Sequence, residues 1–167
     1  MSRVGRRLRA ALGTWPDARG WRRVGFELLW GLPLVALLAF AAGFARFDPM
    51  AFGPQWLALF FGLMLVPALG EELAFRALLV PPPDRPFAPW QWAIAVGAFI
   101  LWHPLQALIF GPPWSAIFLA PGFLAIVAVL GSLLVRLYRA TGSIWPCVLV
   151  HWSVVAGWKL LFAGPIG

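Results

Sequence analysis

The sequence predicts an all-α protein, a polytopic transmembrane bundle of about five membrane-spanning helices with a cytoplasmic N-terminus. Hydrophobic residues make up 62% of the 167 residues and charged residues only 11%, against about 25% charged in soluble domains. The apolar runs are long rather than alternating, which favours helices over a β-barrel. The stretches without Asp, Glu, Lys or Arg approach or exceed the roughly 20 residues of a spanning helix. They are 28–45, 49–70, 86–135 and 140–158.

The first element is a basic segment, residues 1–23, which is predicted to be a cytoplasmic arm. It holds seven arginines and one acid, Asp17, and therefore most of the net charge of +7. The remaining residues, 24–167, form the predicted membrane-embedded domain and carry almost no net charge. They offer no basic face, so nucleic acid is not an expected partner. A short helix on the anionic inner leaflet and a solvated, disordered arm both fit the segment.

The first two spans follow from the first two apolar stretches. The span over about 26–45 is predicted to be an uncleaved anchor, because its basic leader and its apolar stretch are both longer than those of a signal peptide. The second span begins in the stretch 49–70 and continues to about Val80, where the prolines at 81–83 stop the helix. This second span therefore carries three charges into the membrane.

The remaining spans come from the two later stretches. The turn signal at 111–114, Gly-Pro-Pro-Trp, divides the long stretch into helices at about 91–110 and 116–136. The stretch 140–158 supplies the fifth helix, and its lone Cys147 is expected to be a small buried hydrophobe. Arginines in the loops then follow the positive-inside rule. We expect a multi-pass protein of the cell (inner) membrane that contacts membrane lipids.

Ionisable side chains at membrane depth are the candidate functional residues. A charge near the bilayer centre costs ~2.5–3.5 kcal/mol, so these groups must face protein or a water-filled cavity. Glu72 and Arg76 stand four residues apart in the favourable acid-first order, whereas Glu71 lies about 100° round the helix. At ~1.5 Å per residue, Glu71, His103 and His151 reach similar depths on three helices. These residues therefore predict one site.

The chemistry that these residue types favour is hydrolysis by activated water. A carboxylate shielded from bulk water is a stronger base, and neighbouring imidazoles can orient the water or stabilise an oxyanion. No serine has a Gly-x-Ser-x-Gly context. A two-His, one-carboxylate zinc site of Glu71, His103 and His151 stays open, but no zinc motif is present and no cofactor is predicted. Taken alone, Glu72 and a snorkelling Arg76 could equally be a structural ion pair.

Three motifs occur in order along the chain. The segment 71–76, Glu-Glu-Leu-Ala-Phe-Arg, matches Glu-Glu-x-x-x-Arg, and Phe99 with His103 matches Phe-x-x-x-His. The third is Thr-Gly-Ser-Ile-Trp-Pro at 141–146, followed by His151. Over about residues 58–158 the chain thus resembles the CAAX protease and bacteriocin-processing (CPBP, or Abi) family of intramembrane proteases.

The resemblance implies an endopeptidase similar to the type II CAAX prenyl protease, acting on a membrane-associated protein or peptide. It implies that Glu71 activates water, with Glu72 and Arg76 supporting it. His103, whose motif includes Phe99 as a supporting residue, would position the water or the carboxylate. The resemblance also implies that His151 stabilises the oxyanion.

The family's usual Asn or Asp, four residues after this histidine, is replaced here by Val155. Loss of one oxyanion donor costs ~10²–10³ in rate.

The leading interpretation is a glutamate-dependent endopeptidase whose site opens toward the cytoplasmic side. One alternative is a non-catalytic membrane interaction or bacteriocin-immunity protein of the same family, for which Val155 is the best support. A weaker alternative is a small transporter that uses Glu71 and the histidines as a proton relay. The sequence indicates neither a particular substrate nor an oligomeric state.

Overall fold

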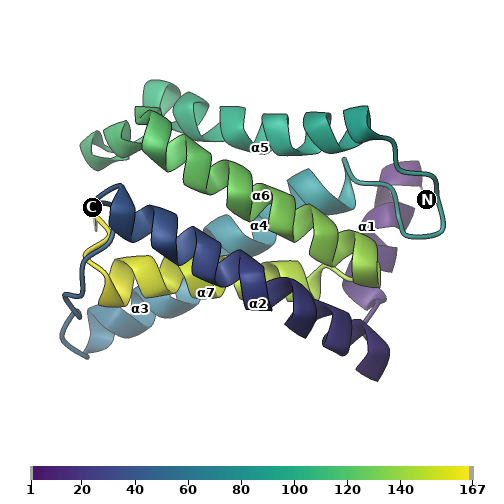
Figure 1. The fold of residues 1–167 in the computed structure, drawn as a ribbon, viewed down its shortest axis with the longest axis horizontal. Coiled ribbons are helices and arrows are strands. Elements are labelled where there is room, and N and C mark those ends of the chain that lie inside the picture. Colours follow the sequence, from purple (N-terminus) through teal and green to yellow (C-terminus); the bar gives the residue numbers. More distant parts are fainter. Residues whose placement is uncertain (1, 166–167) are drawn as a thin grey trace.

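A computed structural model describes residues 2–165, and within this range the chain is helical, with one isolated bridge between Asp48 and Phe162 (Figure 1). The α-helices are α1 (Arg3–Gly13), α2 (Ala18–Ala41), α3 (Pro54–Leu63), α4 (Gly70–Glu72), α5 (Pro89–Ile109), α6 (Pro121–Thr141) and α7 (Trp145–Leu161). The other helical segments are the π-helical η1 (Met64–Leu69) and η2 (Leu73–Ala77) and the 3₁₀-helical η3 (Pro113–Leu119).

The membrane-crossing elements agree with the predicted polytopic helical bundle. Within the described residues, four helical segments are long and apolar enough to span a membrane: α2, the combined segment Pro54–Ala77, α5 and α6. The fifth predicted span forms α7, whose 17 residues make a shorter helix of ~25 Å. Large apolar side chains such as Leu29 and Leu108 are exposed on the outer helices, as expected for surfaces that face lipid.

The N-terminal segment is helical and packs on the bundle. The Ser143 hydroxyl donates to the Thr14 carbonyl at 2.7 Å, and the Trp145 indole donates to the Leu12 carbonyl at 2.9 Å. α2 begins at Ala18, before the predicted 26, because the Asp17 carboxylate caps it by accepting from the backbone of its first turn. Residue 23 therefore lies inside α2, and the division into 1–23 and 24–167 stays a prediction.

The second span is one apolar segment but not one continuous α-helix. Val66 has a non-helical backbone (φ −135°, ψ 115°), and Pro67 follows it without an N–H to donate. Two π-helical turns then flank the short α4 that carries the paired acids. The helical part ends at Ala77, and an irregular turn leads to Val80 and the predicted proline stop.

The later elements differ from the predicted ranges mainly in their starts. α6 begins at Pro121 rather than about 116, because the preceding residues form η3. It ends at Gly142, whose φ of +68° is the left-handed conformation that glycine adopts readily. Cys147 is free and fully buried among apolar side chains, as predicted.

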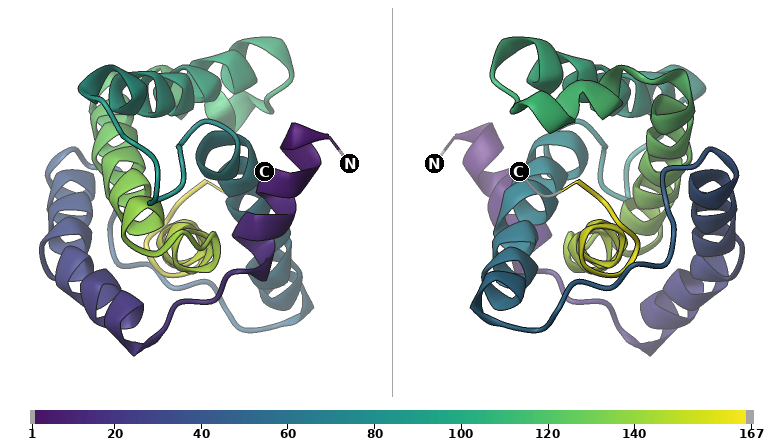
Figure 2. Two further views of the ribbon diagram at one scale, coloured as in Figure 1. Left: turned by 90° about the vertical axis from the view of Figure 1, so that its right-hand side faces the viewer. Right: turned by 90° about the vertical axis from the view of Figure 1, so that its left-hand side faces the viewer.

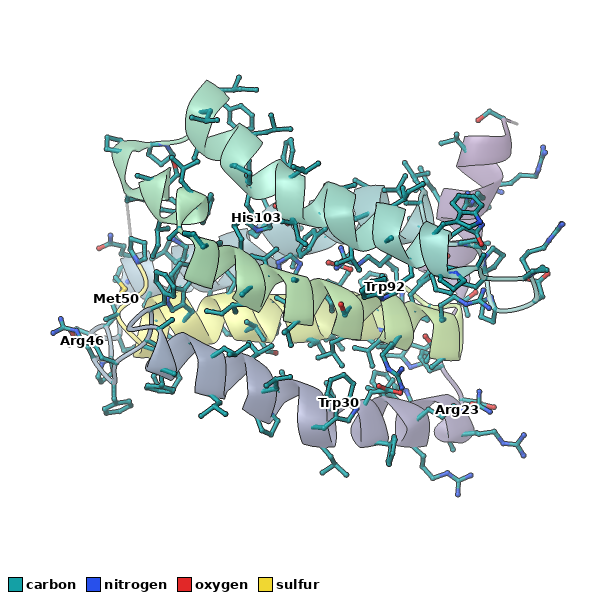
Figure 3. The ribbon with its side chains drawn as sticks, turned by 45° about the horizontal axis from the view of Figure 1, so that its top comes forward. Arg23, Trp30, Arg46, Met50, Trp92 and His103 are labelled. Atoms are coloured by element: carbon teal, nitrogen blue, oxygen red, sulfur yellow. The ribbon has the colours of Figure 1, made fainter. Side chains whose placement is uncertain are left out.

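The helices pack around α6 and α7. α6 contacts α2, α5 and α7, and α7 also contacts α3. The end-on views in Figure 2 show α7, in yellow, surrounded by the other helices, with α1 against one end of the bundle. Figure 3 shows the side chains that project from these helices. This arrangement brings α4, α5 and α7 together.

Candidate functional site

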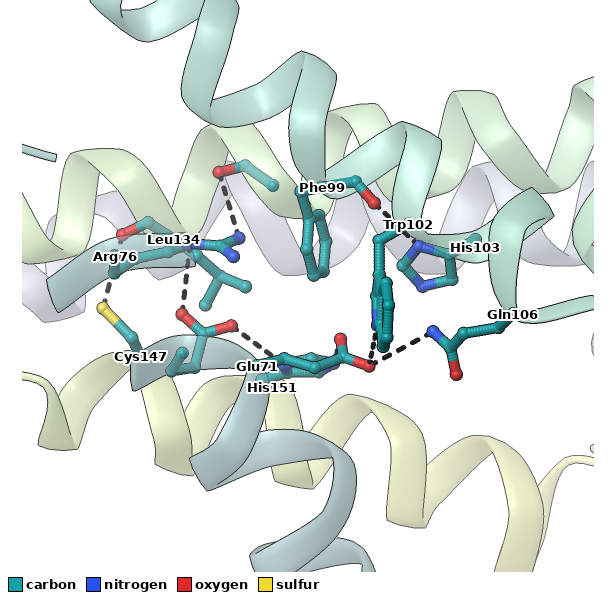
Figure 4. Close-up of polar contacts among 11 residues, drawn as sticks. Glu71, Arg76, Phe99, Trp102, His103, Gln106, Leu134, Cys147 and His151 are labelled. Carbon is teal, nitrogen blue, oxygen red and sulfur yellow. Dashed lines mark hydrogen bonds and ion pairs between the residues drawn. The ribbon is translucent and has the colours of Figure 1, made fainter. Parts of the chain in front are cut away.

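Glu72 links two of the predicted site residues. Its carboxylate is fully buried, with one oxygen 3.1 Å from Arg76 Nε and the other 2.9 Å from His151 Nδ1 (Figure 4). The structure thus contains the predicted contact between residues four apart. It is a charge contact, because Arg76 Nε has no aligned hydrogen bond. A carboxylate oxygen only accepts, so His151 Nδ1 carries the proton and Nε2 points away.

Arg76 is held inside the bundle. Its exposed fraction is 1%, so it does not snorkel to the interface. The guanidinium carbon lies 4.2 Å from the centroid of the Phe99 ring, and Nη2 donates to the Gly131 carbonyl at 3.5 Å. A Cβ at Gly131 would stand 2.9 Å from the Phe99 ring. The absence of a side chain at this position therefore lets α6 approach both groups.

Glu71 faces a different part of the bundle from Glu72. One carboxylate oxygen, Oε1, accepts from the Trp102 indole at 3.0 Å and from the Gln106 amide at 3.5 Å. The other, Oε2, lies 4.0 Å from His151 Nε2, is buried and has no hydrogen-bond partner among the described residues. Glu71 therefore has one oxygen held by hydrogen bonds and one that can accept a proton from a bound molecule.

Trp102 and Gln106 are site residues that the sequence interpretation missed. Both lie on α5 and hold Glu71, and Figure 4 shows both side chains directed at the same oxygen of the Glu71 carboxylate. Gln106 carried a usable signal, because an amide three residues after His103 stands on the same side of an otherwise apolar stretch. Trp102 carried none, since the chain contains 11 tryptophans.

His103 lies near this cluster without touching a carboxylate among the described residues. Its Nδ1 donates to the Phe99 carbonyl at 2.9 Å, so in the neutral ring Nε2 is an acceptor. The ring packs against aromatic side chains, with centroids 5.0 Å from Phe99 and 5.3 Å from Phe118. His103 is thus the one predicted histidine that the structure separates from both acids.

A cavity of about 930 Å³ connects these groups. Glu71, His103 and His151 line it, so the acid and the two imidazoles predicted to share a depth do surround one space. Its other walls are mostly apolar and include Val155. Glu72 and Arg76 stand behind this wall rather than in it.

The cavity extends toward the end of the bundle opposite α1. Its lining there comes from residues after α2 and at the ends of α5 and α7, including Phe44, Phe110 and Phe162. At the other end, α1 packs against the turn after η2 and the start of α7. The sequence analysis expected an opening on the side of the basic arm, whereas the described lining extends toward the other end; the side of the membrane to which the site opens stays a prediction.

Metal-binding geometry is absent from the described residues. Within residues 2–165, no group of three His, Cys, Asp or Glu side chains could hold a metal ion. Glu71 and His151 approach one another, but His103 does not join them, and its Nδ1 donates to the Phe99 carbonyl.

Comparison with known families gives one match. A family model described as type II CAAX prenyl endopeptidase Rce1-like matches residues 53–157, which is more than half of the chain. This range contains Glu71, Glu72, Arg76, the α5 site residues and His151. No curated protein and no solved structure matches the chain.

Proposed function

The chain belongs to the Rce1-like family of type II CAAX prenyl endopeptidases, and we propose that it hydrolyses a peptide bond of a membrane-associated substrate with water activated by Glu71. The observation that carries the proposal is the unpaired Oε2 of Glu71. This oxygen is buried, borders the cavity and faces His151 Nε2 at 4.0 Å. A free acceptor on a held carboxylate is what a general base for water requires.

The proposed reaction begins at Glu71. Trp102 and Gln106 hold Oε1 and so direct Oε2 toward the cavity. Oε2 removes a proton from water, the resulting hydroxide attacks the substrate carbonyl carbon, and a tetrahedral oxyanion forms. The proton on Glu71 then passes to the leaving amine as the carbon–nitrogen bond breaks. Shielding from bulk water strengthens the carboxylate as a base.

His151 is the proposed partner for the oxyanion. Glu72 accepts its Nδ1 proton and also contacts Arg76, which fixes the ring with Nε2 on the side of Glu71. When protonated, Nε2 can donate to the negative oxygen beside Glu71. His103 has the complementary role, because its acceptor Nε2 suits a water hydrogen.

Val155 replaces the family's usual Asn or Asp, and another residue of the cavity wall can supply the missing hydrogen-bond donor. Val155 lines the cavity and offers no donor. Among the lining residues that the structure describes, Gln106 has the only side-chain amide. We propose that Gln106 supplies the missing oxyanion donor from α5. Without such a donor, the non-catalytic alternative would be favoured.

The test compares two Glu-to-Gln variants in proteoliposomes. Peptides ending in Cys-a-a-X, with and without a farnesyl group, are the probes. Glu71→Gln should lower kcat by about 10²–10⁴-fold. Glu27→Gln is the matched control, because Glu27 pairs with Arg136 at 2.6 Å and does not line the cavity. Retained cleavage by Glu71→Gln would contradict the assignment of the base.

Three further results would each favour one of the alternatives. Failure of the wild type to cleave any probe, together with an unchanged cellular phenotype of Glu71→Gln, would favour a non-catalytic protein. Inhibition by a membrane-permeant chelator with rescue by zinc would favour the zinc-dependent mechanism. Proton uptake that depends on Glu71 without cleavage would favour the transporter.

A further inference from the structure

Lys159 is the only lysine of the chain, and it lies in the cavity wall. It follows His151 by two turns of α7 and is 9% exposed. Its Nζ donates to the Pro165 carbonyl and lies 3.9 Å from the centroid of the Trp114 ring. No carboxylate within the described residues lies within ion-pair distance of Nζ. Within residues 2–165, the buried ammonium therefore has only neutral partners.

A buried ammonium is costly unless it is paired, and an apolar residue of similar length would pack the same space. The carbonyl and the aromatic ring offset part of this cost but leave the charge uncompensated. Lys159 is the only lysine or arginine among the lining residues that the structure describes, and it lies about two helical turns beyond His151 on α7. It also lies beyond the matched family range, which ends at residue 157. The cavity thus has a lysine at one end that lacks a negatively charged partner among the described residues.

We propose that Lys159 binds the C-terminal carboxylate of the peptide substrate, an inference that rests on the proposed function. The eight residues from His151 to Lys159 correspond to ~12 Å along α7. An extended peptide covers ~3.3–3.6 Å per residue. The distance therefore accommodates three or four residues between the bond at Glu71 and the carboxylate at Lys159.

The position of Lys159 favours a peptide carboxylate over a lipid headgroup. Lys159 lines the same cavity as Glu71, and the other lining residues are mostly apolar. A ligand that fits has an apolar middle and one negative end. A phospholipid carries its charge at the membrane surface, whereas this ammonium is buried.

The experiment measures kcat/KM for two peptides of identical sequence, one with a free C-terminal carboxylate and one with a C-terminal amide. A charge-assisted hydrogen bond predicts that the wild type prefers the free acid by about tenfold or more, mainly through KM. Lys159→Gln should abolish this preference by lowering kcat/KM for the free acid to about the value for the amide, whereas Lys159→Arg should retain the preference in part. Arg46→Gln, at an exposed cation near the same end, is the matched control and should keep the preference.

Each other outcome overturns the inference in a recognisable way. Equal loss on both peptides in Lys159→Gln would give Lys159 a structural role. Rates that rise with anionic lipid content, equally for both peptides and only when Lys159 is present, would indicate a headgroup site. Cleavage of both peptides by the wild type without preference would overturn the carboxylate site but not the proposed function. No cleavage of either peptide would overturn the proposed function and this inference with it.

Discussion

Glu71 and Glu72 are neighbours in the sequence, yet their carboxylates have different surroundings. Glu72 is bound on both oxygens by charged or polar side chains, Arg76 and His151. Glu71 has one oxygen bound by neutral donors and one unpaired. The step of about 100° between adjacent helical residues explains the difference, because it turns one acid toward α7 and the other toward α5. One glutamate therefore organises the site while the other is available for chemistry.

The buried pair of Glu72 and Arg76 predicts strongly non-additive stability effects. Glu72→Gln or Arg76→Met alone should lower the free energy of unfolding by ~3–5 kcal/mol, because each leaves an uncompensated buried charge. The double variant should lose much less than the sum of the single losses. Denaturant titration in detergent micelles, followed by tryptophan fluorescence, measures these changes.

The exposed pair of Arg46 and Asp48, with side chains 79% and 56% exposed, provides the control for this cycle. Asp48→Asn and Arg46→Met should each change the free energy of unfolding by no more than ~1 kcal/mol. Additive losses at Glu72 and Arg76 would contradict the interpretation that they form a compensated buried pair.

Close helix contacts decide how the elements are assembled. α2 packs on α6 through Gly31, where an added Cβ would lie 2.7 Å from two Leu133 carbons. Leu133 is fully buried and has little space to move. Gly131 has a similar role between α6 and Phe99. Small residues at these points let helix backbones approach closely, as is common inside membranes.

Two glycines of α2 provide a matched prediction at this scale. Gly31→Ala should destabilise the protein by ~1–3 kcal/mol, because the new methyl group overlaps Leu133. Gly25→Ala meets nothing within 4 Å and should be neutral or stabilise the helix by up to ~1 kcal/mol. Thermal unfolding of both variants in the same detergent compares them directly. Equal behaviour of the two variants would argue against tight packing of α2 on α6.

The whole molecule is a bundle with two unlike ends. α1 packs against one end, where Arg139 also donates to the carbonyls of Pro81 and Pro82. The cavity extends toward the other end, where Lys159 and Trp114 lie. If the N-terminus is cytoplasmic, as the positive-inside rule predicts, the cavity extends toward the opposite side of the membrane.

Cysteine labelling tests this orientation, because the natural Cys147 is fully buried and should not react. Phe47→Cys lies between α2 and α3 at a position that is 73% exposed, and Asp84→Cys lies between η2 and α5 at a side chain that is 75% exposed. A membrane-impermeant maleimide should label Phe47→Cys in intact cells and Asp84→Cys only in inverted vesicles. The reverse pattern would place the N-terminus outside.

Much of the fold follows from short-range features of the sequence. The lengths of the apolar stretches and the prolines at 81–83 predict where helices run and where the second span stops, because these properties act within a few residues. The start of α2 was missed because the Asp17 cap extends the helix through arginines that composition assigns to a separate arm. The start of α6 was missed because local composition does not distinguish a 3₁₀ segment such as η3 from the helix that follows it.

The sequence by itself determined that the chain is a helical membrane protein and that its few buried ionisable groups must lie together, because lipid makes isolated charges costly. Only the tertiary structure decided which atoms meet. It paired Glu72 with His151, brought Trp102 and Gln106 to Glu71 and put Lys159 in the same cavity. These contacts join residues far apart in the chain, and they depend on helix rotations and crossings that local sequence patterns do not encode.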